Sequence, residues 1–243
     1  MTQSLLSDLQ TRAQGFLSDL RTEDSGLPDT VLVTAAYRDT AFTPELFRAL
    51  DIPLPDRLHR AVDKRRAEYL AGRAMTLAAM ALLGHAPTPV SNAASRAPVW
   101  PAGLTGSISH ARGRCACLLS RNTEQTCGVD TEAMASGRSL AAILSETLSP
   151  EERETITKGA FPVATNATLA FSAKEALFKA LYPRVNRHFG FDAATLRSPP
   201  DARSLTLTLA TNLTEALGAG QSFTLRHSQT DTHVLTWLVT PAS

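Results

Sequence analysis

The chain has 243 residues, of which 43% are hydrophobic and 19% are charged, and its formal net charge is +1. These values are typical of a globular protein that buries a sizeable core, as one large domain or two smaller ones. The small net charge argues against a strongly basic nucleic-acid-binding domain, and no apolar run is long enough to span a bilayer.

The first half of the chain is predicted to hold one long helix and several strands. The expected elements are a helix and loop to about residue 29, a strand at 30–36, a short helix at 44–50, a long helix at 57–83, an irregular loop at 86–103 and a strand at 115–120. Apolar residues recur at helical spacing through the long helix, and Gly84 is expected to cap its end. The β-branched composition of 30–36 favours a strand.

The polar turn at 121–126 is the predicted domain boundary, which separates a lobe at 1–122 from a lobe at 123–243. The elements expected after it are a strand at 127–130, helices at 139–148, 149–157 and from 171 to about 182, and strands at 204–210, 222–227 and 232–240. Ser149, followed by a proline and two acids, is expected to cap a helix. Each half therefore combines a long helix with strands, which permits an α+β fold of two related lobes.

Three acidic side chains form the first candidate site. Asp130 and Glu132 are two residues apart, a spacing that points both side chains to one face of a strand. Two adjacent carboxylates repel each other unless a cation or a proton lies between them. If the helix after residue 171 packs beside this strand, Glu175 can join them as a third ligand for Mg²⁺ or Mn²⁺, with a phosphate completing the shell. The alternative is a strand end whose acids face solvent.

Two lysines accompany Glu175 on the predicted helix. Glu175 and Lys179 are four residues apart and share one face, so they can also form an ordinary surface ion pair. Lys174 is adjacent to Glu175 and would point away from Lys179. At least one of the two lysines is therefore expected to face solvent or a loop.

Cationic residues upstream form a second candidate site. Arg66 and Arg73 are seven residues apart on one face of the long helix, Arg96 lies in the proline-containing loop, and His110 follows Ser109. The planar guanidinium of arginine binds two phosphate oxygens at once, and small residues before His110 let a phosphate approach the backbone. A solvated helix face and a turn histidine without a role are the alternatives.

The three cysteines, Cys115, Cys117 and Cys127, are expected to be reduced and buried. Their odd number does not suggest a disulfide framework, and the sequence has no C-x-x-C pair that would indicate zinc. Charged residues interrupt the leucines of residues 1–20, so we predict no signal peptide and a cytoplasmic location.

Four short motifs, taken in their order along the chain, resemble the 4′-phosphopantetheinyl transferases, specifically those of the enterobactin synthetase component D type. The motifs are Arg66 to Arg73 (RAEYLAGR), Gly106 to His110 (GSISH), Gly128 to Glu132 (GVDTE) and Phe171 to Glu175 (FSAKE). The segment from Arg96 to Pro101 (RAPVWP) is also similar to that subgroup. The resemblance covers roughly residues 57–183.

The resemblance implies a fold of two pseudo-symmetric α+β lobes with coenzyme A in the cleft between them. The implied reaction transfers 4′-phosphopantetheine from coenzyme A to a serine of an apo carrier protein and leaves adenosine 3′,5′-bisphosphate. A peptidyl carrier of siderophore synthesis is favoured over an acyl carrier protein, and a monomer is expected.

The resemblance also implies roles for individual residues. Asp130, Glu132 and Glu175 would hold Mg²⁺, and Glu175 would also take the proton of the carrier serine, directly or through water. Lys179 would bind the pyrophosphate. His110 and Arg66 would bind the 3′-phosphate, and Arg73, Arg96 and Ser109 would belong to the same pocket. Asp130 and Lys174 are also expected to contact the cofactor.

Two other functions are compatible with these residues. One is a different Mg²⁺-dependent phosphotransferase or phosphohydrolase that uses the same carboxylates. The other is a non-catalytic module that binds coenzyme A or docks a carrier. The acids and Lys179 favour the transferase, because a docking module has no need of them.

Overall fold

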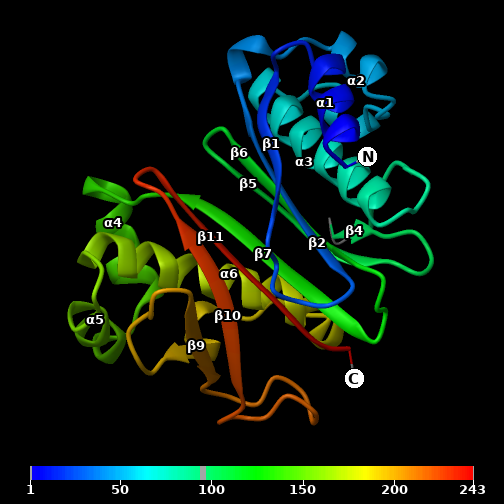
Figure 1. The fold of residues 1–243 in the computed structure, drawn as a ribbon. Coiled ribbons are helices and arrows are strands. Elements are labelled where there is room, and N and C mark those ends of the chain that lie inside the picture. Colours follow the sequence, from blue (N-terminus) through cyan, green and yellow to red (C-terminus); the bar gives the residue numbers. More distant parts are fainter. Residues whose placement is uncertain (1, 94–96, 243) are drawn as a thin grey trace. The chain divides into compact units, whose positions relative to one another are not determined.

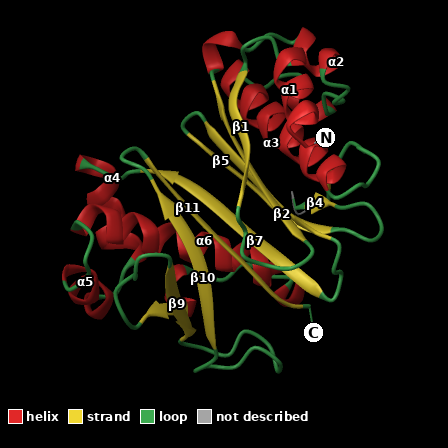
Figure 2. Ribbon diagram, in the orientation of Figure 1, coloured by secondary structure: helices red, strands yellow, loops and turns green. Residues whose placement is uncertain are grey.

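The structure is a computed structural model that describes residues 2–93 and 97–242. It falls into two units, Met1–Thr123 and Glu124–Ser243. Each unit combines an antiparallel sheet with a long helix that packs against it (Figure 1). The predicted α+β class is confirmed, since helices and strands both make up each unit (Figure 2).

The first unit contains a four-stranded antiparallel sheet in the order β1-β2-β6-β5. Its strands are β1 (Leu17–Glu23), β2 (Thr30–Tyr37), β5 (Thr105–Ala111) and β6 (Arg114–Ser120), and its helices are α1 (Thr2–Arg12), α2 (Glu45–Ala49) and α3 (Asp63–Leu82). Small apolar residues of α3 let the helix pack closely on β2 and β6. Cys115, Cys117 and Leu119 share the face of β6 that lies in this core, and all three cysteines of the chain are reduced and buried, as predicted.

Two strands of the main sheet of this unit, β1 and β5, were not predicted, and the start of its long helix was misplaced. The edge strand β1 is largely polar because only one of its faces meets the core, and the small and polar residues of β5 hide its alternation. Helix α3 begins at Asp63 rather than at residue 57, because residues 56–58 form a separate 3₁₀ turn and Val62 is extended. The loop expected at 86–103 includes a short hairpin of β3 (Ser91–Asn92) and β4 (Pro98–Val99).

The second unit contains a five-stranded antiparallel sheet in the order β7-β11-β10-β9-β8. Its strands are β7 (Gln125–Ala133), β8 (Ala194–Leu196), β9 (Ser204–Leu209), β10 (Ser222–Gln229) and β11 (His233–Pro241), and its helices are α4 (Gly137–Ala142), α5 (Pro150–Thr157) and α6 (Val163–Val185). A π-helical turn, Ile143–Thr147, follows α4. Helix α6 packs on β7 and β11, and the apolar residues of α6 and the sheet form the core.

Helix α6 begins eight residues before the predicted start, at Val163 instead of residue 171. Its first turns contain polar residues that are nevertheless buried, which breaks the apolar pattern. The Asn166 amide donates hydrogen bonds to the Ile156 and Phe161 carbonyls, and Thr168 Oγ1 accepts one from the Ala135 amide. These polar residues join α6 to α5 and to neighbouring loops instead of marking a helix boundary.

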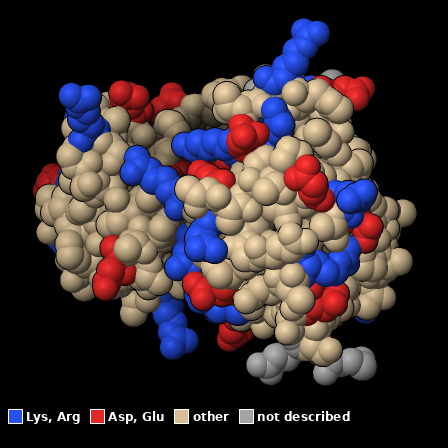
Figure 3. Space-filling view, turned by 90° about the horizontal axis from the view of Figure 1, so that it is seen from above, with Lys and Arg blue, Asp and Glu red and all other residues tan. Residues whose placement is uncertain are grey.

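The predicted cap at Ser149 is confirmed. Ser149 Oγ accepts a hydrogen bond of 3.2 Å from the Glu152 amide, and the Glu152 carboxylate accepts one of 2.9 Å from the Ser149 amide. Charged side chains of both signs lie interspersed on the face seen in Figure 3, in line with the small net charge. Among the described residues, no helix is long and apolar enough to cross a membrane.

Candidate active site

Strand β7 and helix α6 carry the candidate catalytic residues of the second unit, and the two elements pack together as the sequence analysis expected. Gly128 on β7 has no side chain, so the backbone of α6 approaches the strand at Ala176. Strand β7 is longer than predicted and includes both Asp130 and Glu132. The close approach brings Asp130 into contact with side chains of α6.

The carboxylate of Asp130 is buried and is bound through both of its oxygens. Oδ2 accepts a hydrogen bond of 2.9 Å from Ser172 Oγ, which also lies 2.9 Å from Thr236 Oγ1 on β11. Oδ1 accepts one of 2.8 Å from Lys179 Nζ, which donates another, of 3.1 Å, to the Val129 carbonyl. Charge-assisted hydrogen bonds from two sides fix the orientation of the carboxylate.

Glu175 has a raised pKa. Burial is the main cause, and the negative charge of Asp130 adds to it, while Lys179 and His188 oppose the shift. Asp130 and Glu175 are therefore close enough for their negative charges to repel each other. A carboxylate with a raised pKa is a stronger base than an ordinary glutamate and is therefore a candidate proton acceptor.

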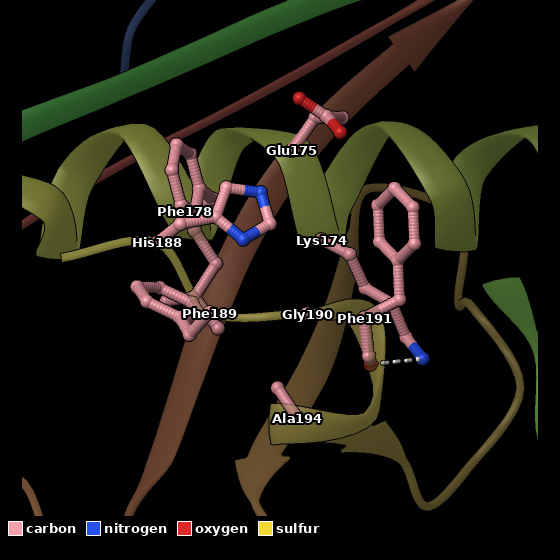
Figure 4. A pocket seen from close by; sticks show the side chains of 9 residues that line it. Lys174, Glu175, Phe178, His188, Phe189, Gly190, Phe191 and Ala194 are labelled. Carbon is pink, nitrogen blue, oxygen red and sulfur yellow. Dashed lines mark hydrogen bonds between the residues drawn. The ribbon is translucent and has the colours of Figure 1, made fainter. Parts of the chain in front are cut away.

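Glu175 also lines a pocket of about 140 Å³ in the second unit (Figure 4). Aromatic rings form part of the pocket wall: the ring of Phe178 lies 4.8 Å from that of Phe189 and 5.4 Å from that of His188. Lys174, Leu177, Gly190, Phe191 and Ala194 complete the lining. An acid beside an enclosed apolar surface is a common arrangement in ligand sites.

The three carboxylates are not gathered as the sequence analysis expected. Among the described residues, no group of three or more His, Cys, Asp or Glu side chains is arranged to hold a metal ion. Mg²⁺, however, usually takes only one or two carboxylates from the protein and completes its shell with water and phosphate. Asp130 and Glu175, which repel each other, could supply these two carboxylates. In this structure the positive charge beside Asp130 is that of Lys179.

Lys174 does not have the surroundings of a phosphate ligand. Its ammonium is buried and donates to Glu152 Oε2 at 2.8 Å, to the Thr147 carbonyl at 3.0 Å and to the Phe191 carbonyl at 3.0 Å. Burial lowers the pKa of Lys174, and the hydrogen bond and charge of Glu152 oppose that shift. An ammonium has three hydrogens, so these three acceptors use them all and leave none for a phosphate. This arrangement corrects the expectation that Lys174 contacts the cofactor.

The candidate phosphate ligands lie in the first unit. Arg66 on α3 donates to the Ala61 carbonyl at 2.8 Å and lies 3.5 Å from Asp63. Arg73 lies about two helical turns further along α3 and is only 6% exposed. It donates a hydrogen bond of 2.9 Å to Asn92 Oδ1, and its guanidinium lies over the Tyr69 ring, 4.8 Å from the ring centroid. Arg73 Nε is buried without a hydrogen-bond partner among the described residues. Arg96 lies outside the described residues.

Ser109 and His110 are neighbours on β5 and therefore point to opposite faces of the sheet. Ile108 packs on the α3 core at Gly72, and the alternation places His110 on that same face. Ser109 is buried on the other face, and His110 is half-buried.

Several side chains of the second unit were missed by the sequence analysis. Ser172 lies three residues before Glu175 and seven before Lys179, so helical spacing alone could have placed it on their face. Glu152 was recognised only through its part in the Ser149 cap. For His188, no pattern in the sequence indicates that it lies near Glu175.

Comparison with known proteins identifies relatives of both units. Residues 54–120 match a family model described as the 4′-phosphopantetheinyl transferase N-terminal domain, and residues 126–236 match that of the 4′-phosphopantetheinyl transferase superfamily. The chain is 32% identical over 185 residues to 4′-phosphopantetheinyl transferase Svp of Streptomyces mobaraensis, covering 74% of each chain. It is 30% identical over 190 residues to 4′-phosphopantetheinyl transferase PptT of Mycobacterium tuberculosis, covering 75% of this chain and 79% of that one.

A further relative carries the name of a siderophore enzyme. The chain is 37% identical over 147 residues to enterobactin synthase component D of Salmonella typhi. That match covers 60% of this chain and 61% of the relative, so it spans less than two thirds of the relative's length.

Proposed function

This chain belongs to the 4′-phosphopantetheinyl transferase superfamily, and on that premise we propose that it transfers the 4′-phosphopantetheine group of coenzyme A to a serine of an apo carrier protein. The products would be the holo carrier and adenosine 3′,5′-bisphosphate. The observation that carries the proposal is the cluster of Asp130, Lys179 and Glu175 on β7 and α6, inside the segment that matches the superfamily model.

We propose that Glu175 accepts the proton of the carrier serine, directly or through a water molecule. Its raised pKa supports this role, because a stronger base removes a hydroxyl proton more readily. The serine oxygen would then attack the phosphorus of coenzyme A that bears the pantetheine arm. The bond from that phosphorus to the bridging oxygen of the pyrophosphate would break, and the nucleotide would leave.

We propose that Asp130 and Glu175 hold Mg²⁺, or Mn²⁺ in its place, with Glu132 as a further ligand. The repulsion between Asp130 and Glu175 supports a cation between them. When bound, the ion would supply Lewis acidity at the pyrophosphate. Lys179 would shift from Asp130 to the pyrophosphate and offset charge on the leaving oxygen.

We propose that Arg66, Arg73, Ser109 and His110 bind phosphates of coenzyme A. The best support comes from Arg73, a buried guanidinium whose Nε has no partner among the described residues and is available to an anion. Arg96 remains a predicted member of this group. A cytoplasmic location, a monomeric state and a preference for peptidyl carriers of siderophore or other nonribosomal peptide synthesis also remain predictions.

The test is an assay of the protein with coenzyme A, Mg²⁺ and a panel of apo peptidyl and acyl carriers, followed by nucleotide analysis. We expect adenosine 3′,5′-bisphosphate to form in step with holo carrier, and EDTA to stop both. Breakdown of coenzyme A without carrier modification would instead indicate a phosphohydrolase. Coenzyme A binding without turnover would indicate a docking module.

A further inference from the structure

A buried ion pair lies next to the proposed base. Lys174, which precedes Glu175 in the chain, is paired with Glu152 at 2.8 Å, and the two side chains are only 3% and 2% exposed. The free-energy cost of removing two charges from water offsets their mutual attraction, so a buried ion pair by itself adds little to the stability of the fold. Its position calls for another explanation.

The pair joins the chain segment at 191–196 to helix α6. Lys174 Nζ donates to the Phe191 carbonyl, and Glu152 Oε1 accepts a hydrogen bond of 2.7 Å from the Leu196 amide. The two ends of the segment are thus bound to the two members of one ion pair. On the other side, Lys174 Nζ also binds the Thr147 carbonyl, which ties the end of the π-helical turn to the same point.

This segment forms one wall of the pocket beside Glu175. Phe191 and Ala194 line the pocket with Glu175, and Figure 4 shows the bond from Lys174 to the Phe191 carbonyl at its edge. The Phe191 ring lies 5.7 Å from that of Phe171 on α6. The ion pair and this aromatic contact therefore both tie the wall to α6, in addition to the packing of Ala193, Ala194 and Leu196 in the core.

We propose that Lys174 and Glu152 are positioning residues, which hold the segment at 191–196 against α6 so that the pocket beside Glu175 has the shape its ligand requires. The inference rests on the proposed function only for the identity of that ligand, a part of coenzyme A or of the carrier serine segment. It assigns Lys174 no contact with phosphate.

The first test compares Lys174→Met with Glu152→Gln in the full chain. Positioning predicts that both variants lower kcat/KM for coenzyme A to a similar degree, about 100-fold, because a small misplacement near the reacting groups is costly. Hydrogen exchange of the peptide that contains the Leu196 amide should rise in both. If Glu152→Gln keeps wild-type kinetics while Lys174→Met loses activity, Lys174 acts on the ligand directly and the proposal is overturned.

A second test separates positioning from stability. The double variant Glu152→Leu, Lys174→Met removes both buried charges, so its melting temperature should recover relative to Lys174→Met. Positioning predicts that its kcat/KM nevertheless stays low and its exchange stays fast. Recovery of wild-type kinetics in the double variant would show that the pair serves the fold alone.

The exposed pair of Glu154 on α5 and Lys158 at the C-cap of that helix, at 2.7 Å, is the matched control. Glu154→Leu, Lys158→Met should match the wild type in kinetics and in exchange of the 191–196 segment. Failure of the proposed function is recognised separately, because the wild-type protein would then modify no carrier, while the exchange measurement would still report on the ion pair.

Discussion

A Cβ atom built on Gly128 would lie 2.0 Å from the backbone carbonyl oxygen of Ala176. No side chain fits in that space, so the glycine sets how closely α6 approaches β7. The hydrogen bonds of Ser172 and Lys179 to Asp130 depend on this approach, because the carboxylate is on the strand and both donors are on the helix.

Gly128→Ala should therefore push α6 away from β7. We expect a loss of about 1–3 kcal/mol in the free energy of unfolding, typical of overpacking, together with a large loss of activity in the folded protein. Chemical denaturation and transfer assays measure the two effects. Gly218→Ala is the control, because its Cβ would be 3.6 Å from the nearest atom, an ordinary contact. Wild-type activity in Gly128→Ala would refute this explanation of the glycine.

Ser172→Ala should disorient Asp130. The substitution removes a hydrogen bond to a buried carboxylate, so we expect a loss of roughly 1.5–3 kcal/mol in the free energy of unfolding. If Asp130 holds Mg²⁺, the Mg²⁺ concentration for half-maximal activity should rise as well. Ser145→Ala, which removes an exposed hydroxyl from the π-helical turn, should change neither quantity. An unchanged Mg²⁺ requirement in Ser172→Ala would argue against the role of Asp130.

Glu175→Gln should stabilise the folded protein while reducing transfer. The pKa of Glu175 is raised by folding, so the unfolded chain releases this proton at lower pH than the folded one. Stability from this group is complete below the ordinary glutamate pKa and is lost as pH rises through the raised one. The glutamine of the variant does not ionise, so the variant does not lose this stability as the pH rises. Its free energy of unfolding should therefore equal that of the wild type at acid pH and exceed it at neutral pH.

Glu154→Gln gives the control for that measurement, because Lys158 lowers the pKa of Glu154 and the pH dependence has the opposite sign. Denaturation at both pH values tests the pair of variants. A Glu175→Gln protein that is less stable than the wild type at neutral pH would contradict the assigned environment of Glu175.

His188→Ala should shift the pH profile of transfer. The positive charge of His188 lowers the pKa of Glu175, so its removal should raise that pKa further. The acid limb of kcat/KM, which reports deprotonation of the proposed base, should then move to higher pH. His59→Ala, in the first unit, should leave the limb in place. A limb that stays or moves to lower pH in His188→Ala would exclude His188 as a neighbour of the base.

A residue of the site could be placed from the sequence only where its spacing from a neighbour along the chain determines its position. Asp130 and Glu132 follow strand alternation, and Glu175 and Lys179 follow helical spacing, so their places on β7 and α6 could be predicted from sequence. The partner of Lys174 was not, because Glu152 lies 22 residues away and only the tertiary fold brings it close. Lys174 was therefore predicted to contact the cofactor, whereas it forms a buried ion pair.

The same reason explains the errors in the fold. Periodic apolar residues predicted the C-terminal half of α6 and the three strands of the tail correctly. The N-terminal part of α6 has buried Asn166 and Thr168, whose hydrogen bonds to α5 and to a loop cannot be predicted from the apolar pattern. Strand β5 is made of small and polar residues, and its pairing with β6 becomes visible only in the sheet.

The intact mass of a carrier protein is the most direct test of the proposed transfer. The purified protein is incubated with coenzyme A, Mg²⁺ and an apo peptidyl carrier, beside a carrier whose acceptor serine is replaced by alanine. We predict that the serine carrier gains the mass of one phosphopantetheinyl group and that the alanine carrier gains none. A folded protein that leaves every apo carrier of the panel at its original mass would contradict the proposed function.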